Sequence, residues 1–276
     1  MNTLQSVVFG FIAGLTDIFP VSSQAHEALL LTFLGTGEQS AFMRLMIHLA
    51  IFAALYYVSS SYILKMLRQR RLAKIPKRRR KRPVDQQCLL DSRLIITAGV
   101  IIVLGYILYS KTSSLGGKLS WISALLLVNG AILFVPALLP TGNKDSRALT
   151  PLDGVLIGLG GVASIFPGLS AIGCMTSVAS VCGSDRTYAF HIASILQMIV
   201  TGARIIYDVL AMISSGFGIA GFGAFLSVLL AAAAAFLGTF LAIRWMGMIA
   251  KNIGFHIFSL YCIGLALLTF ILYLSI

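Results

Sequence analysis

The polar residues best suited to chemistry interrupt an apolar segment near the start of the chain. Asp17 precedes Pro20, and Ser23 and His26 lie three residues apart, so they share one face if they are helical. Pro20 suits the start of a helix, Ser22 or Ser23 suits its cap, and free N–H groups at such a helix start bind anions. A carboxylate, a hydroxyl and an imidazole therefore converge on an anion-binding turn.

A second break, inside the apolar segment 152–182, repeats the pattern of the first. Ile-Phe-Pro occurs at residues 18–20 and again at 165–167, and a serine follows three residues later in both places. In the second break, Gly168 allows close backbone approach, and Ser170 can cap a helix or donate a hydroxyl. Paired interrupted segments in two halves of a chain are typical of repeat-built membrane folds with the site at the breaks.

The elements that must position these breaks are apolar. Hydrophobic residues make up 58% of the 276 residues and charged residues 11%, whereas about a quarter of a soluble domain is charged. This composition excludes an ordinary soluble globule, a disordered chain and a disulfide scaffold. Eight apolar segments, many long enough to cross the roughly 30 Å of bilayer hydrocarbon, lie at about 4–34, 41–64, 92–110, 120–140, 152–182, 187–214, 219–243 and 253–276.

The two broken segments, 4–34 and 152–182, are predicted to be re-entrant hairpins, because irregular backbone at membrane depth is tolerated only inside protein or against a watery cavity. A hairpin makes no net crossing, so each half crosses three times and the second half is inverted. We therefore expect an all-α polytopic membrane protein with a single membrane domain, 1–276. Repeat 1 covers about 1–140 and repeat 2 about 152–276, and each holds one re-entrant helix hairpin plus three transmembrane helices.

The basic residues set the expected orientation. The net charge is +12, and eleven of the 21 Lys and Arg residues lie between Lys65 and Arg82. The positive-inside rule places the loop 65–91 in the cytoplasm, and the first hairpin on the extracytoplasmic side. The segment 65–82 is then expected to contact anionic lipid headgroups, and no nucleic acid is expected as a partner.

Three stretches of the chain resemble the bacitracin-resistance type of undecaprenyl-diphosphate phosphatase. They are GLTDIFPVSSQAH at 14–26, the stretch 158–173 with Pro-Gly-Leu-Ser at its centre, and 240–268. The resemblance covers nearly the whole chain. It implies a multi-pass hydrolase of the bacterial plasma membrane that removes the terminal phosphate of undecaprenyl diphosphate at the outer face, recycling the lipid carrier for cell-wall synthesis. It also implies a divalent metal, Mg²⁺ or Ca²⁺.

The resemblance further implies roles for individual residues. Asp17 would help to hold the metal, with Glu27 as a second carboxylate. His26 would act as base or acid, and Ser23 would attack or orient the phosphate. Whether Ser23 or a water activated by His26 is the nucleophile stays open. The residues expected to bind phosphate oxygens are Ser22, Gly168, Ser170 and Thr176.

The chain departs from the family pattern at charged positions. Ala13 stands where the family has an acidic or amide residue, Asp17 stands where Glu is usual, and Ala171 stands where the family has Arg. Hydrolysis of a diphosphate needs positive charge on the transferred phosphoryl group, and arginine supplies it through a bidentate fork. Alanine does not replace it.

Two arginines are candidates for the missing positive charge. Arg44 is expected near the outer mouth of its span, and Arg204 lies inside the sixth apolar segment. Because Asp208 follows Arg204 by four residues, we expect these two to form an ion pair within their own helix rather than a phosphate clamp.

Two other functions stay open beside the phosphatase. Facing hairpins with an anion site at the midplane also suit a non-hydrolytic transporter or flippase of a lipid phosphate. An inactive paralogue that acts through its basic loop is the third. The oligomeric state is open as well, including a homo-oligomer.

Overall fold

The computed structural model describes residues 1–37, 39–80, 82–112, 118–216, 218 and 221–275. Over these residues the chain is helical, apart from turns and one isolated bridge between Lys144 and Ser184. The helices, in chain order, are α1 (Thr3–Ile18), α2 (Ser23–Phe33), α3 (Ala41–Lys74), η1 (Lys77–Arg79), α4 (Gln86–Tyr106), α5 (Tyr109–Thr112), α6 (Leu119–Phe134), η3 (Val135–Leu138), α7 (Pro151–Val162), η4 (Ala163–Ile165), α8 (Ala171–Val181), α9 (Arg186–Ser215), α10 (Gly221–Asn252) and α11 (Ile257–Ser275).

Six of these helices have the length and apolar composition to cross a membrane. They are α3, α4, α6 with its 3-10 extension, α9, α10 and α11. The prediction of an all-α polytopic membrane protein with two broken segments is confirmed. Two helices run beyond their predicted ends, since α3 continues to Lys74 and α10 to Asn252. A hydropathy pattern stops at the last apolar residue, whereas Lys, Arg, Met and Leu continue a helix readily.

The first hairpin packs its entering arm directly against α10. A Cβ atom on Gly10 would lie 2.1 Å from the carbonyl oxygen of Ala231, and one on Gly14 would lie 2.1 Å from that of Ala235. The hydroxyl of Thr239 donates to the carbonyl of Gly14 at 3.1 Å. Small residues thus let two backbones approach closely, as is typical of helix pairs in membranes.

The second hairpin packs its entering arm against α4 in the same manner. A Cβ atom on Gly158 of α7 would lie 2.7 Å from the carbonyl oxygen of Ala98. Pro151 occupies the first turn of α7, and Thr150 with Asp153 forms a capping box that fixes where the helix begins. Each hairpin is therefore held by a long helix from the other half of the chain.

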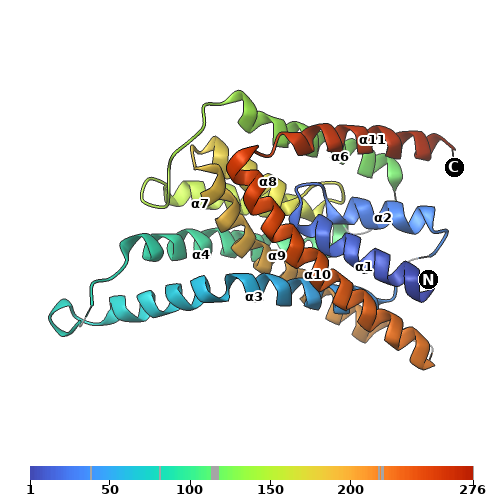
Figure 1. Ribbon diagram of the computed structural model, residues 1–276, viewed down its shortest axis with the longest axis horizontal. Helices are drawn as coiled ribbons and strands as arrows, with labels where there is room; N and C mark the ends of the chain where they lie inside the picture. The colour runs from blue at the N-terminus through green and yellow to red at the C-terminus, as the bar shows by residue number, and fades with distance from the viewer. Residues whose placement is uncertain (38, 81, 113–117, 217, 219–220, 276) are drawn as a thin grey trace.

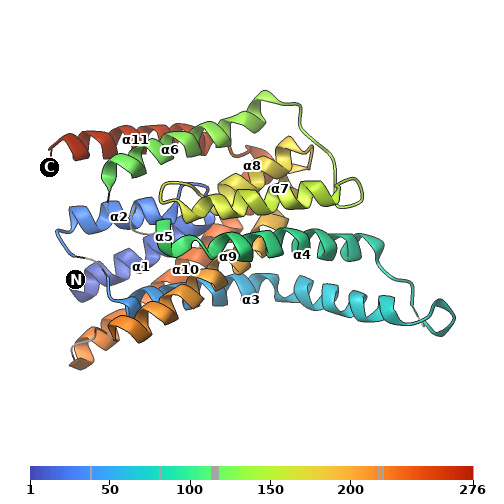
Figure 2. The ribbon, with the colours of Figure 1, turned by 180° about the vertical axis from the view of Figure 1, so that it is seen from behind.

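The hairpins enter the molecule from opposite ends (Figures 1 and 2). The α1–α2 hairpin enters from the end that holds both chain termini, and the α7–α8 hairpin enters from the end that holds the basic loop. A hairpin followed by three long helices occurs twice along the chain, and α3 packs against α9 while α6 packs against α11. The inverted repeat and its bounds, 1–140 and 152–276, stay predictions.

The basic loop begins on a helix. Lys65, in α3, places its Nζ 2.8 Å from an Oδ atom of Asp85, the residue that caps α4. The hydrogen bond from the Lys65 ammonium lowers the pKa of the Asp85 carboxyl. The pair joins the C-terminal part of α3 to the start of α4 and so ties the two ends of the loop together.

Candidate active site

The tips of the two hairpins touch each other inside the molecule. The backbone N–H of Gly168 donates to Ser22 Oγ at 3.1 Å, and Ser170 Oγ donates to the carbonyl oxygen of Phe19 at 3.5 Å. Ser22 stands at the start of α2 but does not cap it with its side chain, so that prediction is wrong. Its hydroxyl is used across the tips instead. Ser170 caps α8 through Gly173 N at 3.2 Å, as predicted.

Asn129, in α6, joins the two tips from the side. Its Nδ2 donates to the carbonyl of Pro20 at 3.0 Å, and its Oδ1 accepts from the backbone N–H of Ser170 at 2.9 Å. The side chain is fully buried. Asn129 was not predicted, although an amide inside an apolar span is a signal of interhelical bonding. We call Ser22, Gly168, Ser170 and Asn129 the tip latch.

Asp17 lies at the end of α1, beside the tip latch, and accepts three hydrogen bonds. Its Oδ1 accepts from Arg204 Nη1 at 2.7 Å and from Ser23 Oγ at 3.2 Å, and its Oδ2 accepts from Gln197 Nε2 at 2.8 Å. Arg204 Nη1 also lies 3.5 Å from Ser23 Oγ. We call these four residues the Asp17 cluster. It places one hydroxyl between a carboxylate and a guanidinium.

The cluster is buried, and α9 supplies half of it. Asp17 and Arg204 are each 4% exposed and Gln197 is 1% exposed. Gln197 and Arg204 are seven residues apart, which is close to two helical turns, so both face the first hairpin. A buried carboxylate needs a cation and hydrogen bonds, because desolvation costs several kcal/mol per ion. Gln197 was missed because its only sequence signal is polarity within an apolar helix.

The expected ion pair within α9 is wrong. Arg204 bonds to Asp17, while Asp208 bonds to α3 through His48 Nδ1 at 2.5 Å and Arg44 Nε at 3.5 Å. The two buried carboxylates, Asp17 and Asp208, each pair with an arginine from another helix. These contacts between helices form in place of the pair that the i, i+4 spacing within α9 favours. Of the two candidate cations, Arg204 reaches the cluster and Arg44 binds Asp208.

Both ring nitrogens of His26 have partners other than Ser23. Its Nδ1 lies 2.8 Å from the carbonyl oxygen of Ser22, and its Nε2 lies 2.7 Å from the hydroxyl of Tyr261. A carbonyl only accepts, so the neutral ring carries its proton on Nδ1 and accepts from Tyr261 at Nε2. The His26 and Tyr261 rings are stacked, with centroids 5.7 Å apart. The predicted serine and histidine thus share a helix but have separate partners, and Tyr261 was not predicted.

The chain matches one protein family over most of its length. The family model described as bacitracin resistance protein BacA matches residues 6–268. The chain belongs to this family. The resemblance noted from the motifs is therefore confirmed. The matched residues cover nearly all of both hairpins, five of the six long helices and most of the sixth.

Curated relatives match the BacA chain over its length. An undecaprenyl-diphosphatase of Methanobrevibacter smithii is 28% identical and covers 95% of this chain and 94% of its own. One from Thermosipho africanus is 29% identical and covers 97% and 99%. Undecaprenyl-diphosphatase 1 of Shouchella clausii is 25% identical and covers 98% and 96%.

The remaining residues expected to bind phosphate have partners within the protein. Thr176 Oγ1 donates to the carbonyls of Ile172 at 2.7 Å and Gly173 at 3.0 Å inside α8, and the residue is fully buried. The polar atoms of Ser22, Gly168 and Ser170 form the tip latch. Phosphate binding by these BacA residues stays a prediction, and in this structure they hold the hairpins together.

The residues present do not fit the divalent metal that the BacA resemblance implies. In the described part of the chain, no group of three or more His, Cys, Asp or Glu side chains could hold an ion. Both oxygens of Asp17 already accept hydrogen bonds, and its cationic partner is Arg204. Glu27 is half-buried and interacts electrostatically with Arg204 and Asp17 without joining a ligand set. The metal itself stays a prediction.

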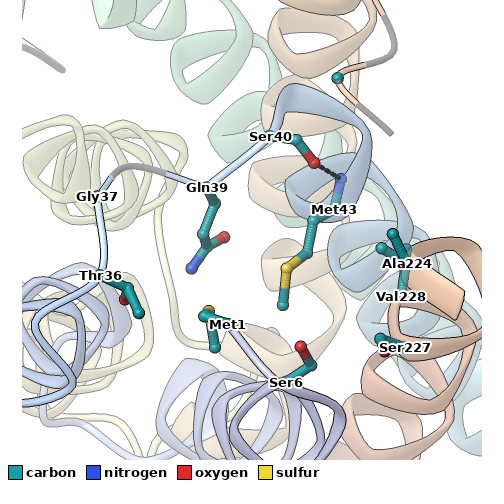
Figure 3. A pocket seen from close by; sticks show the side chains of 11 residues that line it. Met1, Ser6, Thr36, Gly37, Gln39, Ser40, Met43, Ala224, Ser227 and Val228 are labelled. Atoms are coloured by element: carbon teal, nitrogen blue, oxygen red, sulfur yellow. Dashed lines mark hydrogen bonds between the residues drawn. The ribbon is translucent and has the colours of Figure 1, made fainter. Parts of the chain in front are cut away.

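A separate cavity opens at the end of the molecule near the N-terminus (Figure 3). It has a volume of about 220 Å³ and lies where α1, α3 and α10 begin. Among the lining residues that the structure describes, none has a charged side chain and none belongs to the Asp17 cluster. The lining residues are Met1, Ser6, Thr36, Gly37, Gln39, Ser40, Met43, Gly218, Ala224, Ser227 and Val228.

Proposed function

We propose that this BacA protein is a phosphatase that removes the terminal phosphate of a polyprenyl diphosphate, with undecaprenyl diphosphate as the substrate. The observation that carries the proposal is the placement of Ser23. Its hydroxyl is bonded to the Asp17 carboxylate and lies beside the Arg204 guanidinium, at the point where the two hairpin tips meet. The names of the relatives support the same substrate class.

In the proposed first step Ser23 attacks the terminal phosphorus atom. The Ser23 Oγ–P bond forms, the bond from phosphorus to the bridging oxygen breaks, and the hydroxyl proton passes to Asp17. The prenyl monophosphate leaves with the bridging oxygen. Arg204 offsets the negative charge on the phosphoryl oxygens, which is the main demand of phosphoryl transfer.

In the proposed second step water cleaves the phosphoserine. The new oxygen–phosphorus bond forms as the Ser23–phosphorus bond breaks, one proton of the water passes to a phosphoryl oxygen, and Asp17 returns its proton to Ser23. Inorganic phosphate leaves with the water's oxygen and both of its protons. His26 lies one turn from Ser23 on α2, and its bonds to Ser22 and Tyr261 hold the turn on which Ser23 lies.

The proposed setting is the outer face of the bacterial plasma membrane, with the loop 65–91 in the cytoplasm. The first hairpin enters from the end opposite the basic loop (Figure 1), which supports this orientation. The positive charge at 65–82 then faces the anionic lipids of the inner leaflet. The product, a lipid monophosphate, serves the recycling of a cell-wall lipid carrier.

The test is phosphate release by the purified full-length protein. In detergent with undecaprenyl diphosphate, assayed both with Mg²⁺ and with EDTA, the wild type should release phosphate in at least one condition. Ser23→Ala should fall to background. Ser194→Ala is the matched control, because Ser194 is also a buried helical serine, and its hydroxyl donates to the carbonyl of Phe190 within its own helix. Background release by the wild type in both conditions contradicts the proposal.

One observation favours a transporter as the alternative. The Arg204 guanidinium is paired with Asp17, and the family's arginine position is Ala171, so the site holds less positive charge than the family pattern supplies. A non-hydrolytic flippase on this scaffold would move a lipid phosphate across liposomes. Translocation without phosphate release would select this alternative.

A further inference from the structure

We infer that Arg204 and Gln197 of α9 form a phosphate clamp that works without a divalent metal and takes over the charge of the arginine missing at Ala171. The inference rests on the proposed function, because it names how that site recognises phosphate. We call the pair the α9 clamp. Arg204 is the cation and hydrogen-bond donor, and Gln197 is the acceptor.

Two buried atoms of the α9 clamp lack partners. Arg204 Nε and Gln197 Oε1 are buried and have no hydrogen-bond partner among the residues that the structure describes. Buried polar atoms are satisfied in most native structures, and an exception needs a cause. These two atoms lie two turns apart on one helix face. The donor, Arg204 Nε, suits a phosphate oxyanion, and the acceptor, Gln197 Oε1, suits a phosphate hydroxyl or an attacking water.

The guanidinium of Arg204 can hold Asp17 and a phosphate at the same time. Nη1 binds Asp17 at 2.7 Å and approaches Ser23. The Nε–H lies on the other edge of the planar group, together with Nη2, and this edge suits two parallel bonds to phosphate oxygens. Because Nη1 also approaches Ser23 Oγ at 3.5 Å, the guanidinium that would bind the phosphate lies beside the proposed nucleophile.

A divalent ion has no suitable place beside this arginine. Asp17 is the carboxylate within the cluster, and its two oxygens bond to Arg204, Ser23 and Gln197. Mg²⁺ and Ca²⁺ need several oxygen ligands, so an ion would have to displace a guanidinium that is buried and hydrogen-bonded. The positive charge is therefore already part of the protein. A buried guanidinium cannot lose its proton, so it stays charged at any working pH.

The first experiment measures binding with the Ser23→Ala protein, which is slow to turn over. Affinity for undecaprenyl diphosphate is compared in EDTA and in Mg²⁺. The α9 clamp predicts affinities that agree within about threefold. A loss of more than about tenfold in EDTA, restored by Mg²⁺, overturns the inference.

The second experiment changes the clamp itself, in EDTA. Arg204→Lys keeps the charge but removes the Nε–H and the planar edge, and Gln197→Met removes the acceptor. The expected losses of affinity are roughly 10- to 100-fold and roughly 3- to 10-fold, since one or two charge-assisted bonds are lost. Unchanged affinity in both variants overturns the inference.

Matched controls separate the clamp from general damage. Arg244→Lys changes an arginine that stacks on Phe240, and Gln24→Met changes a glutamine that bonds to the carbonyl of Ser164. Both should bind as the parent does. If Arg204→Lys does not fold, as judged by its thermal melt, the affinity of Gln197→Met alone tests the α9 clamp, and an unchanged affinity overturns it.

The outcomes distinguish the inference from the proposed function. Release of phosphate only with Mg²⁺ overturns the metal-free clamp and leaves the phosphatase intact. Binding in EDTA that depends on Arg204, without release in any condition, supports the clamp and contradicts the phosphatase.

Discussion

The two hairpin tips share the Ile-Phe-Pro pattern and touch each other, but they carry different kinds of side chain. Residues 17–26 carry Asp17 and His26, whereas residues 164–173 hold no titratable side chain. The second tip contributes backbone N–H groups and a helix cap to the tip latch. A repeated backbone motif can therefore divide its tasks, with chemistry in one copy and positioning in the other.

The backbone conformations of the tips differ in the same sense. Gly168 adopts a φ of 121°, which glycine reaches without steric cost. Ser22 adopts a φ of 64°, which is strained for a residue with a Cβ atom. The strained residue stands next to Ser23, and its hydroxyl and carbonyl hold Gly168 and His26. Strain is concentrated at functional sites, where the surrounding contacts fix it.

The largest expected effect separates the two tip serines. Ser23→Ala should lower the rate of phosphate release by about 10³-fold or more, because it removes the proposed nucleophile. Ser170→Ala should lower the rate by less than about tenfold, because this hydroxyl caps α8 and its loss lowers stability by about 1 kcal/mol. Steady-state phosphate release measures both. Equal losses would mean that the tips share the chemistry.

The next effect tests the contact between the tips. Asn129→Leu leaves the N–H of Ser170 buried without its partner, and it leaves the carbonyl of Pro20 with only the weak bond from Cys262 Sγ at 3.7 Å. We expect a loss of about 1–3 kcal/mol of stability, which is the cost of one unsatisfied buried group. Thermal unfolding in detergent measures it. Ser123→Ala is the control, because Ser123 donates a single bond from the same helix to Ala266, and a melt equal to that of Asn129→Leu would contradict the latch.

An effect of similar size concerns the glycine of the second tip. A Cβ atom on Gly168 would lie 2.5 Å from Leu125 Cβ, at a φ that L-residues rarely adopt. Gly168→Ala should therefore cost about 1–3 kcal/mol. Gly247→Ala, where a Cβ meets open space, should be neutral or slightly stabilising because it lies within a helix. Equal thermal melts would contradict the close contact.

The smallest effect compares two changes at Ser22. Both Ser22→Ala and Ser22→Gly remove the acceptor for Gly168, but only glycine relieves the positive φ. Alanine should be less stable than glycine by about 1 kcal/mol. The difference in denaturation midpoint between the two variants measures this strain. Equal midpoints would show that the first tip tolerates its conformation without strain.

The features that depend on hydropathy and local residue spacing could be predicted from the sequence. The eight apolar segments, the two breaks, and the pairing of Asp17 with Ser23 at one turn follow from local patterns. The partners from distant elements do not, because Asn129, Gln197 and Tyr261 each look like single polar residues in apolar helices. Sequence spacing favoured Arg204 with Asp208, and only packing shows that α9 turns Arg204 toward the first hairpin.

The most direct test of the account is a structure of the protein with a prenyl methylene-diphosphonate, prepared in EDTA. The account predicts the terminal phosphonate within about 3.5 Å of Arg204 Nε and beside Ser23 Oγ. A phosphonate held at Thr176 and the start of α8, or in the cavity near Met1, would contradict it.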